Sequence, residues 1–142
     1  FADAILKEKK IKVFNNGNMQ RDFTFIADIV EGIFRCCGKN ATPNINFDRY
    51  RPNPSTSFVP HRVFNIGNGK PINLLKFIEI LELNLGKKAI KIFHPIQPGD
   101  VETTFANTKL LEEWIDYRPK VSIETGIKIF SDWYKSIFKD YL

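Results

Sequence analysis

The 142-residue sequence has few of the residues that bind metals or form disulfides. Its two cysteines, Cys36 and Cys37, are adjacent, so they are poorly placed to bridge each other, and no second pair exists to build a disulfide framework. Its two histidines, His61 and His94, lie far apart and near no C-x-x-C or H-x-x-x-H spacing. We therefore expect no metal site and a reducing, cytoplasmic setting.

The sequence also lacks the short motifs that mark common catalytic and nucleotide-binding loops. It contains no G-x-S-x-G, no P-loop and no G-x-G-x-x-G dinucleotide fingerprint. Gly67-Asn68-Gly69 is followed by Pro71 and has no third glycine, so it predicts a turn, and His94 is interpreted as structural. No apolar run approaches the length of a transmembrane helix. The residues themselves therefore predict binding sites at loop ends, no catalytic residue and no membrane partner.

What the sequence does contain is typical of one globular domain, with 43% hydrophobic and 26% charged residues and thirteen phenylalanines for the core. The net charge of +5 would suit an acidic partner, either a nucleic acid or a small phosphate compound. The basic residues are scattered, however, and the densest cluster is Lys7-Glu8-Lys9-Lys10. A solvated, lysine-rich surface is therefore favoured, and we expect no nucleic-acid partner.

Hydrophobic periodicity and turn signals predict alternating helices and short strands, and therefore an α/β or α+β domain. Helices are expected at residues 1–8, over the apolar positions from Ile26 to Cys37, from about Leu74 to Leu85, over Leu110–Ile115, and from Ser122 onward. Strands are expected at Ile11–Phe14, in Arg62–Asn68 together with its closing turn, and at Ala89–Phe93. Residues 38–60 hold four of the eight prolines and predict a long surface loop.

Polar residues and glycines mark the expected helix ends. Asp28 with Glu31 has the spacing of a capping box, with the aspartate as the cap, and Gly38 can end that helix. For the helix expected from about Leu74 to Leu85, Asn73 is the predicted N-cap and Gly86 the predicted end. Asn107 or Thr108 is the predicted cap of the short helix over Leu110–Ile115, and Ser122 is the predicted start of the last helix.

Two turns hold charged residues suited to a small anionic ligand. Arg21 follows a glycine turn and offers a forked, permanently charged group for a phosphate, while Asp22 could orient it or cap nearby backbone. Asp100 ends the turn Gln97-Pro98-Gly99-Asp100, where its carboxylate could accept paired hydrogen bonds from a diol such as a ribose. The alternative for each is an exposed ion pair or a turn aspartate without a ligand.

Five stretches occur in a characteristic order and spacing: VFNNGNMQRDFTFIADIVEGI, RVFNIGN, PINLLKFIEILELNLG, QPGDVETTFANTKLLEEWI and a terminal helix with Trp133-Tyr134. Together they resemble the C-terminal part of an extended short-chain dehydrogenase/reductase that acts on nucleotide sugars. The insertion ending in SFVPHRVFNIGN, and QPGD where UDP-galactose enzymes carry an arginine before PGD, are most similar to UDP-glucuronate 4-epimerases. Two departures from the family are Asn107, where aspartate is common, and Phe25, where tyrosine or histidine is common.

The resemblance implies an NAD-dependent nucleotide-sugar 4-epimerase, an isomerase that interconverts UDP-glucuronate and UDP-galacturonate by transient oxidation at C4. It implies that Arg21 contacts the diphosphate and that Asp100 binds the ribose hydroxyls. It also implies that the backbone at Val13 and Phe14 reads the uracil ring and that Gln97 reaches the nucleotide. The expected partner is therefore a UDP-sugar.

The resemblance further implies that residues 1–142 are a C-terminal substrate-binding domain, a fragment that is inactive alone. A Rossmann domain with NAD, a catalytic Ser/Thr and Tyr-x-x-x-Lys is then expected upstream of Phe1, in a homodimeric full-length protein. Three alternatives stay open: another nucleotide-sugar epimerase or a 4,6-dehydratase of the same family, a non-catalytic basic binding module, and a fragment with only a structural role.

Overall fold

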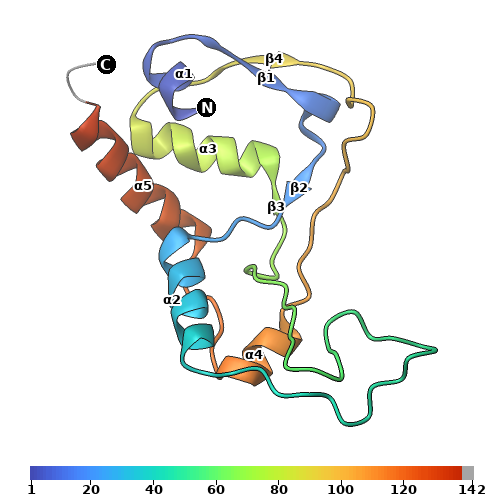
Figure 1. Ribbon diagram of the computed structural model, residues 1–142. Coiled ribbons are helices and arrows are strands. Elements are labelled where there is room, and N and C mark those ends of the chain that lie inside the picture. Colours follow the sequence, from blue (N-terminus) through green and yellow to red (C-terminus); the bar gives the residue numbers. More distant parts are fainter. Residues whose placement is uncertain (139–142) are drawn as a thin grey trace.

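The computed structural model describes residues 1–138, in which helices and short strands alternate along the chain as an α/β fold (Figure 1). Its elements are α1 (Ala2–Leu6), β1 (Lys10–Val13), the 3-10 turn η1 (Phe14–Gly17), β2 (Gln20–Arg21), α2 (Ile26–Cys37), β3 (Ile72–Asn73), α3 (Leu74–Leu85), β4 (Ile90–Phe93), α4 (Lys109–Ile115) and α5 (Ile123–Ile137).

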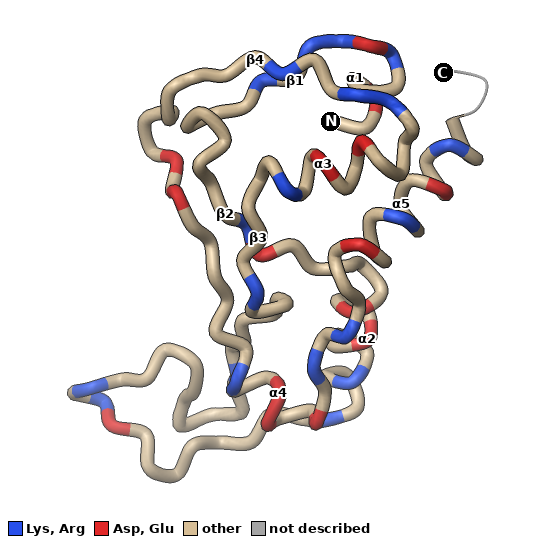
Figure 2. Tube along the Cα trace, turned by 180° about the vertical axis from the view of Figure 1, so that it is seen from behind, with Lys and Arg blue, Asp and Glu red and all other residues tan. Residues whose placement is uncertain are grey.

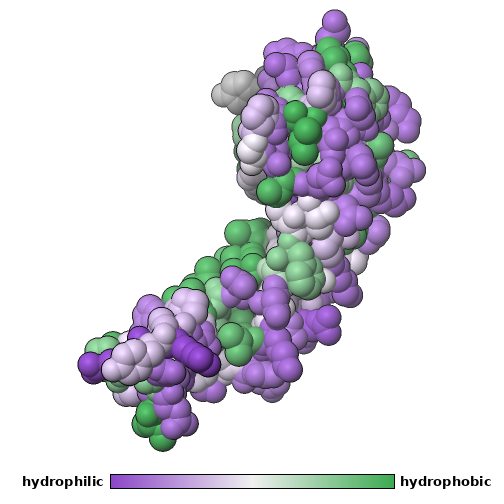
Figure 3. Space-filling view, turned by 90° about the vertical axis from the view of Figure 1, so that its right-hand side faces the viewer, coloured by the Kyte–Doolittle hydropathy of each residue, from purple (hydrophilic) through white to green (hydrophobic). Residues whose placement is uncertain are grey.

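These elements form two lobes. The head lobe contains α1, β1, α3, β4 and α5, and the foot lobe contains α2, α4 and residues 38–71, which connect α2 to β3 (Figure 1). The molecule narrows between the two lobes (Figure 3), at the level of the short antiparallel pair of β2 and β3. Lysines and arginines are interspersed with acidic residues along both lobes (Figure 2).

The hydrophobic core lies in the head lobe. Strands β1 and β4 pair in parallel, from Lys10 opposite Ile90 to Val13 opposite Phe93, and α3 packs against both α1 and α5. Two clusters of buried side chains fill the space between these elements: Ala2, Ile5, Leu6, Ile80, Leu81, Leu85 and Ile127 in one, and Ile11, Val13 and Ile78 in the other. The alternation of exposed and buried residues along β1 turns its apolar face toward α3.

Helix ends that depend on local hydrogen bonds are confirmed. The Asn73 side chain accepts hydrogen bonds from Leu75 N at 2.9 Å and from Lys76 N at 3.4 Å, which caps α3. Gly86 ends the same helix with a left-handed φ of 76°. The Ser122 hydroxyl accepts a hydrogen bond from the backbone N–H of the third residue of α5.

The prediction that Asp28 caps α2 is wrong. Helix α2 begins after Phe25, so Asp28 lies inside its first turn, where it is buried. Its carboxylate accepts hydrogen bonds from Tyr117 Oη at 2.7 Å, Lys120 N at 3.2 Å and Val121 N at 2.9 Å. Burial raises the pKa of Asp28, but these hydrogen bonds outweigh burial and lower it below its usual value. Asp28 therefore fastens α2 to the segment that leads into α5, a role set by residues distant in sequence.

The strand predicted in Arg62–Asn68 is also wrong as an element of this structure. Within the described chain, the segment forms a single isolated bridge, between Arg62 and Thr56, and no ladder with another strand. No helix or ladder strand is present between Cys37 and Ile72, a stretch that Figure 1 shows as a long excursion from the foot lobe. The segment has the alternation of a strand, but residues 1–138 provide no neighbouring strand with which it could pair.

Glu82, on α3, is a charged residue buried in the head lobe, with a side chain that is 3% exposed. Its carboxylate accepts hydrogen bonds from Lys88 Nζ at 3.0 Å, from Ala89 N at 3.0 Å and from Lys91 Nζ. Burial raises the pKa of this carboxyl group, but the hydrogen bonds from the two lysines and the Ala89 N–H outweigh it and lower the pKa to about 2. These bonds fasten the end of α3 to β4.

The substitution Glu82→Gln is expected to weaken the pH dependence of folding. Because the folded-state pKa lies below the ordinary 4.5, the ionised carboxylate stabilises the fold fully above pH 4.5, and this is lost as the pH falls toward 2. The difference in free energy of unfolding between wild type and variant, about 3 kcal/mol at neutral pH, should shrink over this range. Urea unfolding at several pH values measures it. Glu79→Gln, at a half-exposed partner of Lys76 on the same helix, is the control, and a pH-independent difference for Glu82→Gln would contradict the expectation.

Candidate functional site

Strand β2 lies in the middle of the narrow region between the lobes. On one side Gln20 and Arg21 pair with Asn73 and Ile72 of β3, and on the other side Gln20 pairs with Thr103 in parallel. The backbone bonds on that second side run from Gln20 N to Glu102 O at 2.8 Å and from Thr104 N to Gln20 O at 3.2 Å. The segment that follows the Gln97–Asp100 turn is thus held directly beside β2.

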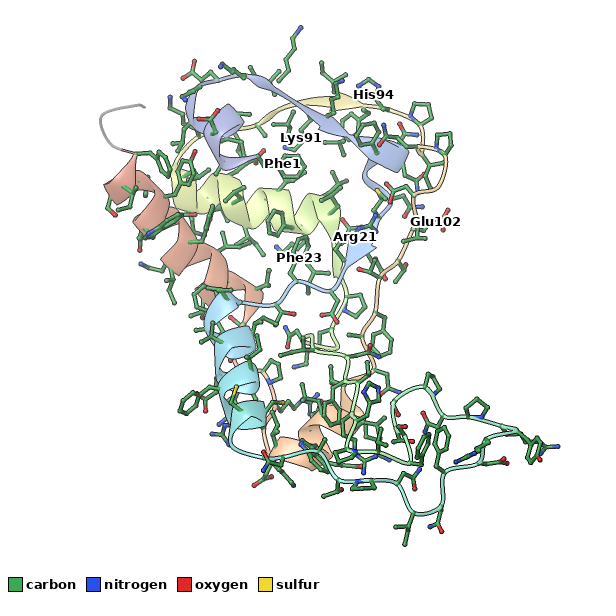
Figure 4. All side chains as sticks on the ribbon, in the orientation of Figure 1. Phe1, Arg21, Phe23, Lys91, His94 and Glu102 are labelled. Atoms are coloured by element: carbon green, nitrogen blue, oxygen red, sulfur yellow. The ribbon has the colours of Figure 1, made fainter. Side chains whose placement is uncertain are left out.

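This pairing brings together Arg21 and Asp100, which are 79 residues apart in the chain. Arg21 Nη2 lies 2.9 Å from Asp100 Oδ1, and Nη1 donates to the carbonyls of Gln20 at 2.8 Å and Glu102 at 3.1 Å. Figure 4 labels Arg21 and Glu102, which lie on neighbouring segments. The Arg21 side chain is 25% exposed and that of Asp100 is 32% exposed, so a ligand can reach both. Two residues that the sequence singled out separately therefore form one site.

The Arg21–Asp100 pair offers two kinds of contact to a ligand. The guanidinium is a permanent, planar cation, which suits the oxygens of a phosphate. Asp100 Oδ1 is engaged by Arg21 and by Val101 N at 2.9 Å, whereas Oδ2 accepts no hydrogen bond from residues 1–138. A diol such as the 2′- and 3′-hydroxyls of a ribose can donate to that oxygen, beside the phosphate that Arg21 would hold.

The remaining residues singled out from the sequence lie at or shortly after the ends of the paired strands β1 and β4. Val13 is fully buried, and its carbonyl accepts a hydrogen bond from His94 N at 2.9 Å. The ring of Phe14 lies 5.6 Å from that of His94, between centroids. The segments that follow β1 and β4 leave the sheet at the same end and run side by side toward β2 (Figure 1). The carbonyl of Gln97 accepts a hydrogen bond from Asp100 N at 3.1 Å, which closes the turn.

Asp22 is the residue whose role the sequence defined least. Its carboxylate does not contact Arg21; it accepts hydrogen bonds from the backbone N–H groups of Asn68 at 3.2 Å, Gly69 at 3.0 Å and Ala106 at 3.2 Å. A Cβ atom at Gly67 would lie 2.9 Å from Asp22 Oδ2, so this close approach requires glycine. Asp22 therefore joins three segments beside Arg21, and the glycine turn that follows Ile66 was the signal for this contact in the sequence.

The same contact bears on whether these residues could hold NAD. Glycine turns bind dinucleotide phosphates through free backbone N–H groups. In the Gly67–Gly69 turn the N–H groups of Asn68 and Gly69 already bind the Asp22 carboxylate, so the turn does not fit a pyrophosphate. In the part of the chain that the structure describes, no group of His, Cys, Asp and Glu could hold a metal ion, and no helix is long and apolar enough to span a bilayer.

Comparisons with known proteins agree with the motifs. Residues 1–67 match a family described as "NAD dependent epimerase/dehydratase family". The chain is 44% identical to "Protein CapI" of Staphylococcus aureus over 139 residues, which are 98% of this chain and 42% of the relative. It is 38% identical to a "Probable UDP-glucuronate 4-epimerase" of Rhizobium meliloti (strain 1021) over 143 residues, 98% of this chain and 41% of the relative.

The fold of the chain is also similar to that of a solved epimerase structure. The chain matches the UDP-glucuronic acid 4-epimerase of Bacillus cereus, in complex with UDP-glucuronic acid and NAD, with a TM-score of 0.74 and 26% identity. The match covers 96% of this chain and 38% of the other. The resemblance to extended short-chain dehydrogenase/reductase epimerases is confirmed, and the chain spans about two-fifths of the length of the curated relatives that it matches.

Proposed function

We propose that this chain, similar in sequence and fold to UDP-glucuronate 4-epimerases, is the C-terminal nucleotide-sugar-binding domain of an NAD-dependent epimerase that interconverts UDP-glucuronate and UDP-galacturonate. The observation that carries the proposal is the Arg21–Asp100 pair, which places a phosphate-binding cation and a diol-binding carboxylate at one site. The sequence relatives and the Bacillus cereus epimerase support the choice of substrate.

In this proposal, residues 1–142 anchor the UDP group and leave the sugar free to turn. Arg21 binds the diphosphate, Asp100 binds the ribose hydroxyls, the backbone at Val13 and Phe14 contacts the uracil, and Gln97 adds a weaker polar contact. The Gly67–Gly69 turn does not fit a dinucleotide phosphate. The proposal assigns NAD and the catalytic acid–base groups to a Rossmann domain of a longer enzyme, which it takes to be a homodimer. This chain alone is then expected to bind UDP without catalysing epimerisation.

The role of Asp100 can be tested by titration calorimetry with UDP and with 2′,3′-dideoxy-UDP, which lacks the ribose diol. Wild type should bind UDP about 10-fold more tightly than the dideoxy compound, because a hydrogen bond to a charged group contributes about 1.5–3 kcal/mol. In Asp100→Asn this preference should largely disappear. Asp132→Asn, at an exposed residue of α5, is the control and should keep it.

The comparison of the two ligands isolates the ribose contact, because Asp100→Asn also releases Arg21 from its ionic partner and so changes affinity for the phosphates. An Asp100→Asn variant that retains the full preference for UDP would contradict the assignment of Asp100. Absence of any UDP binding by wild type would contradict the nucleotide site as a whole.

A further inference from the structure

Seven lysines gather on the head lobe, on two segments that are far apart in the sequence. They are Lys7 and Lys9 between α1 and β1, Lys10 and Lys12 on β1, Lys87 and Lys88 after α3, and Lys91 on β4. The parallel pairing of β1 with β4 brings the two segments together, and Lys87 Nζ joins them by donating to Leu6 O at 2.7 Å. Figure 2 shows basic residues along the turn between α1 and β1 and along both strands. Positive charge that is scattered in the sequence is thus concentrated by the fold.

The acidic residues of these segments neutralise only part of that charge. Lys7 pairs with Asp3, Lys87 pairs with Glu8, and Lys88 and Lys91 share Glu82. Within residues 1–138, the other three lysines of the cluster form no ion pair with a carboxylate. Seven lysines beside three carboxylates account for most of the chain's net charge of +5.

The sheet of β1 and β4 has one covered face and one exposed face. The apolar residues of β1 are buried against α3, so Lys10 and Lys12, which alternate with them, point outward. Their partners in the parallel register are Ile90 and Ile92 of β4, which are 48% and 36% exposed. Two lysines and two isoleucines therefore stand side by side on the outer face, with the aliphatic stems of the lysines beside the apolar side chains.

We propose that this outer face, here called the lysine face and formed by Lys10, Lys12, Ile90 and Ile92 with the neighbouring lysines, adsorbs the protein to an anionic lipid bilayer. Clustered lysines are attracted to the negative surface potential of such a bilayer. Exposed apolar side chains among them can enter the boundary between headgroups and acyl chains. Adsorption needs no membrane-spanning helix, so the lack of a long apolar run, from which the sequence predicts no membrane partner, does not oppose it. The inference goes beyond the proposed function, because it concerns a different surface and requires no nucleotide.

The chemistry of the lysine face favours a bilayer over a protein partner. The cluster contains no arginine, whose planar fork makes the fixed, bidentate contacts that positioned carboxylates require. Lysine ammonium groups are compact point charges, which suit headgroups that can move laterally to meet them. A second copy of the chain would bring like charges together, and lysines on the edge strand β1 oppose the addition of another strand.

The test is co-sedimentation of this chain with phosphatidylcholine vesicles that contain about 30% phosphatidylglycerol, compared with vesicles of phosphatidylcholine alone. Binding should be at least about 10-fold tighter to the anionic vesicles. It should weaken at least about 10-fold when the salt is raised from about 0.1 M to about 1 M, which shortens the Debye length from about 10 Å to about 3 Å. Equal binding to the two kinds of vesicle would overturn the proposal. No UDP is present, so the result is independent of the nucleotide site.

Matched double variants show whether the lysine face itself is responsible. Lys10→Gln with Lys12→Gln should lower binding to the anionic vesicles about 20-fold, because each lysine close to such a surface contributes about fivefold. Lys109→Gln with Lys128→Gln, at side chains that are 79% and 67% exposed on α4 and α5, removes the same charge elsewhere and should lower binding less than about threefold. Equal losses in the two variants would show that only net charge acts.

Two further measurements complete the test. Thermal unfolding checks that both double variants are folded, as their exposed positions lead us to expect. Polyglutamate, offered at the same concentration of negative charge, serves as a soluble acidic competitor. If it displaces the chain from the anionic vesicles completely, the lysine face fits an acidic protein segment and the proposal is wrong.

Discussion

Replacing Arg21 by alanine is expected to lower the affinity for UDP by about 10- to 100-fold, because a hydrogen bond to a charged group contributes about 1.5–3 kcal/mol. Affinity for uridine, which has no phosphate, should change little. The loss has two parts, because the variant removes the phosphate-binding guanidinium and also leaves the Asp100 carboxylate, now without its partner at 2.9 Å, beside an anionic ligand. Calorimetric titrations with UDP and uridine measure both affinities.

Two comparisons make this experiment specific. Arg35→Ala removes another arginine that pairs with a carboxylate, that of Glu31 on α2, and it should leave UDP affinity unchanged. Arg21→Lys keeps the charge but not the fork, so it should bind UDP with intermediate affinity and a stronger dependence on salt. If Arg21→Ala binds UDP as tightly as wild type, Arg21 is only a clamp between β2 and residues 100–102.

Replacing Asp22 by alanine is expected to destabilise the protein by about 3 kcal/mol, since a buried donor left without a partner costs about 1–3 kcal/mol and the three donors here are partly buried. Three backbone N–H groups, those of Asn68, Gly69 and Ala106, lose their acceptor together. Such a change is a large fraction of the roughly 5–15 kcal/mol that stabilises a typical domain. Urea unfolding, followed by tryptophan fluorescence, measures the free energy of unfolding.

Asp22→Asn should be less damaging, because the amide oxygen keeps part of the acceptor capacity while the amide nitrogen faces a donor. Asp132→Ala provides the surface control; its carboxylate pairs with Lys128 on the exposed side of α5, and its loss should cost less than about 0.5 kcal/mol. Equal stabilities of Asp22→Ala and Asp132→Ala would show that water satisfies the three N–H groups of the narrow region.

Features encoded by neighbouring residues were predictable from the sequence. The caps at Asn73 and Ser122 and the end at Gly86 depend on bonds within a single turn of chain, and the structure confirms them. Asp28 was misassigned because the backbone donors that its carboxylate binds lie at positions 120 and 121, which no local spacing reveals. The strand at 62–66 was misassigned because strand formation needs a partner strand, and a single segment's alternation cannot supply one.

In the candidate site, too, the residue types were predictable from the sequence, whereas the contacts between distant residues were not. The residue types at Arg21 and Asp100 indicated a phosphate and a diol, but their contact depends on the pairing of β2 with residues 102–104. Local pattern alone did not distinguish support of Arg21 from capping of backbone as the role of Asp22. The structure resolves this in favour of the backbone, since three donors from two distant segments converge on its carboxylate.

The Asp22 contacts also determine which parts of the molecule can move separately. The backbone N–H groups of the turn at 67–69 form an anion-binding site. The carboxylate of Asp22, just after β2, occupies that site within the same chain. Arg21 directly precedes Asp22 in the chain. A hinge motion that carried Arg21 toward or away from a nucleotide would have to carry the turn and Ala106 with it, so the end of β2 and this part of the foot lobe move together.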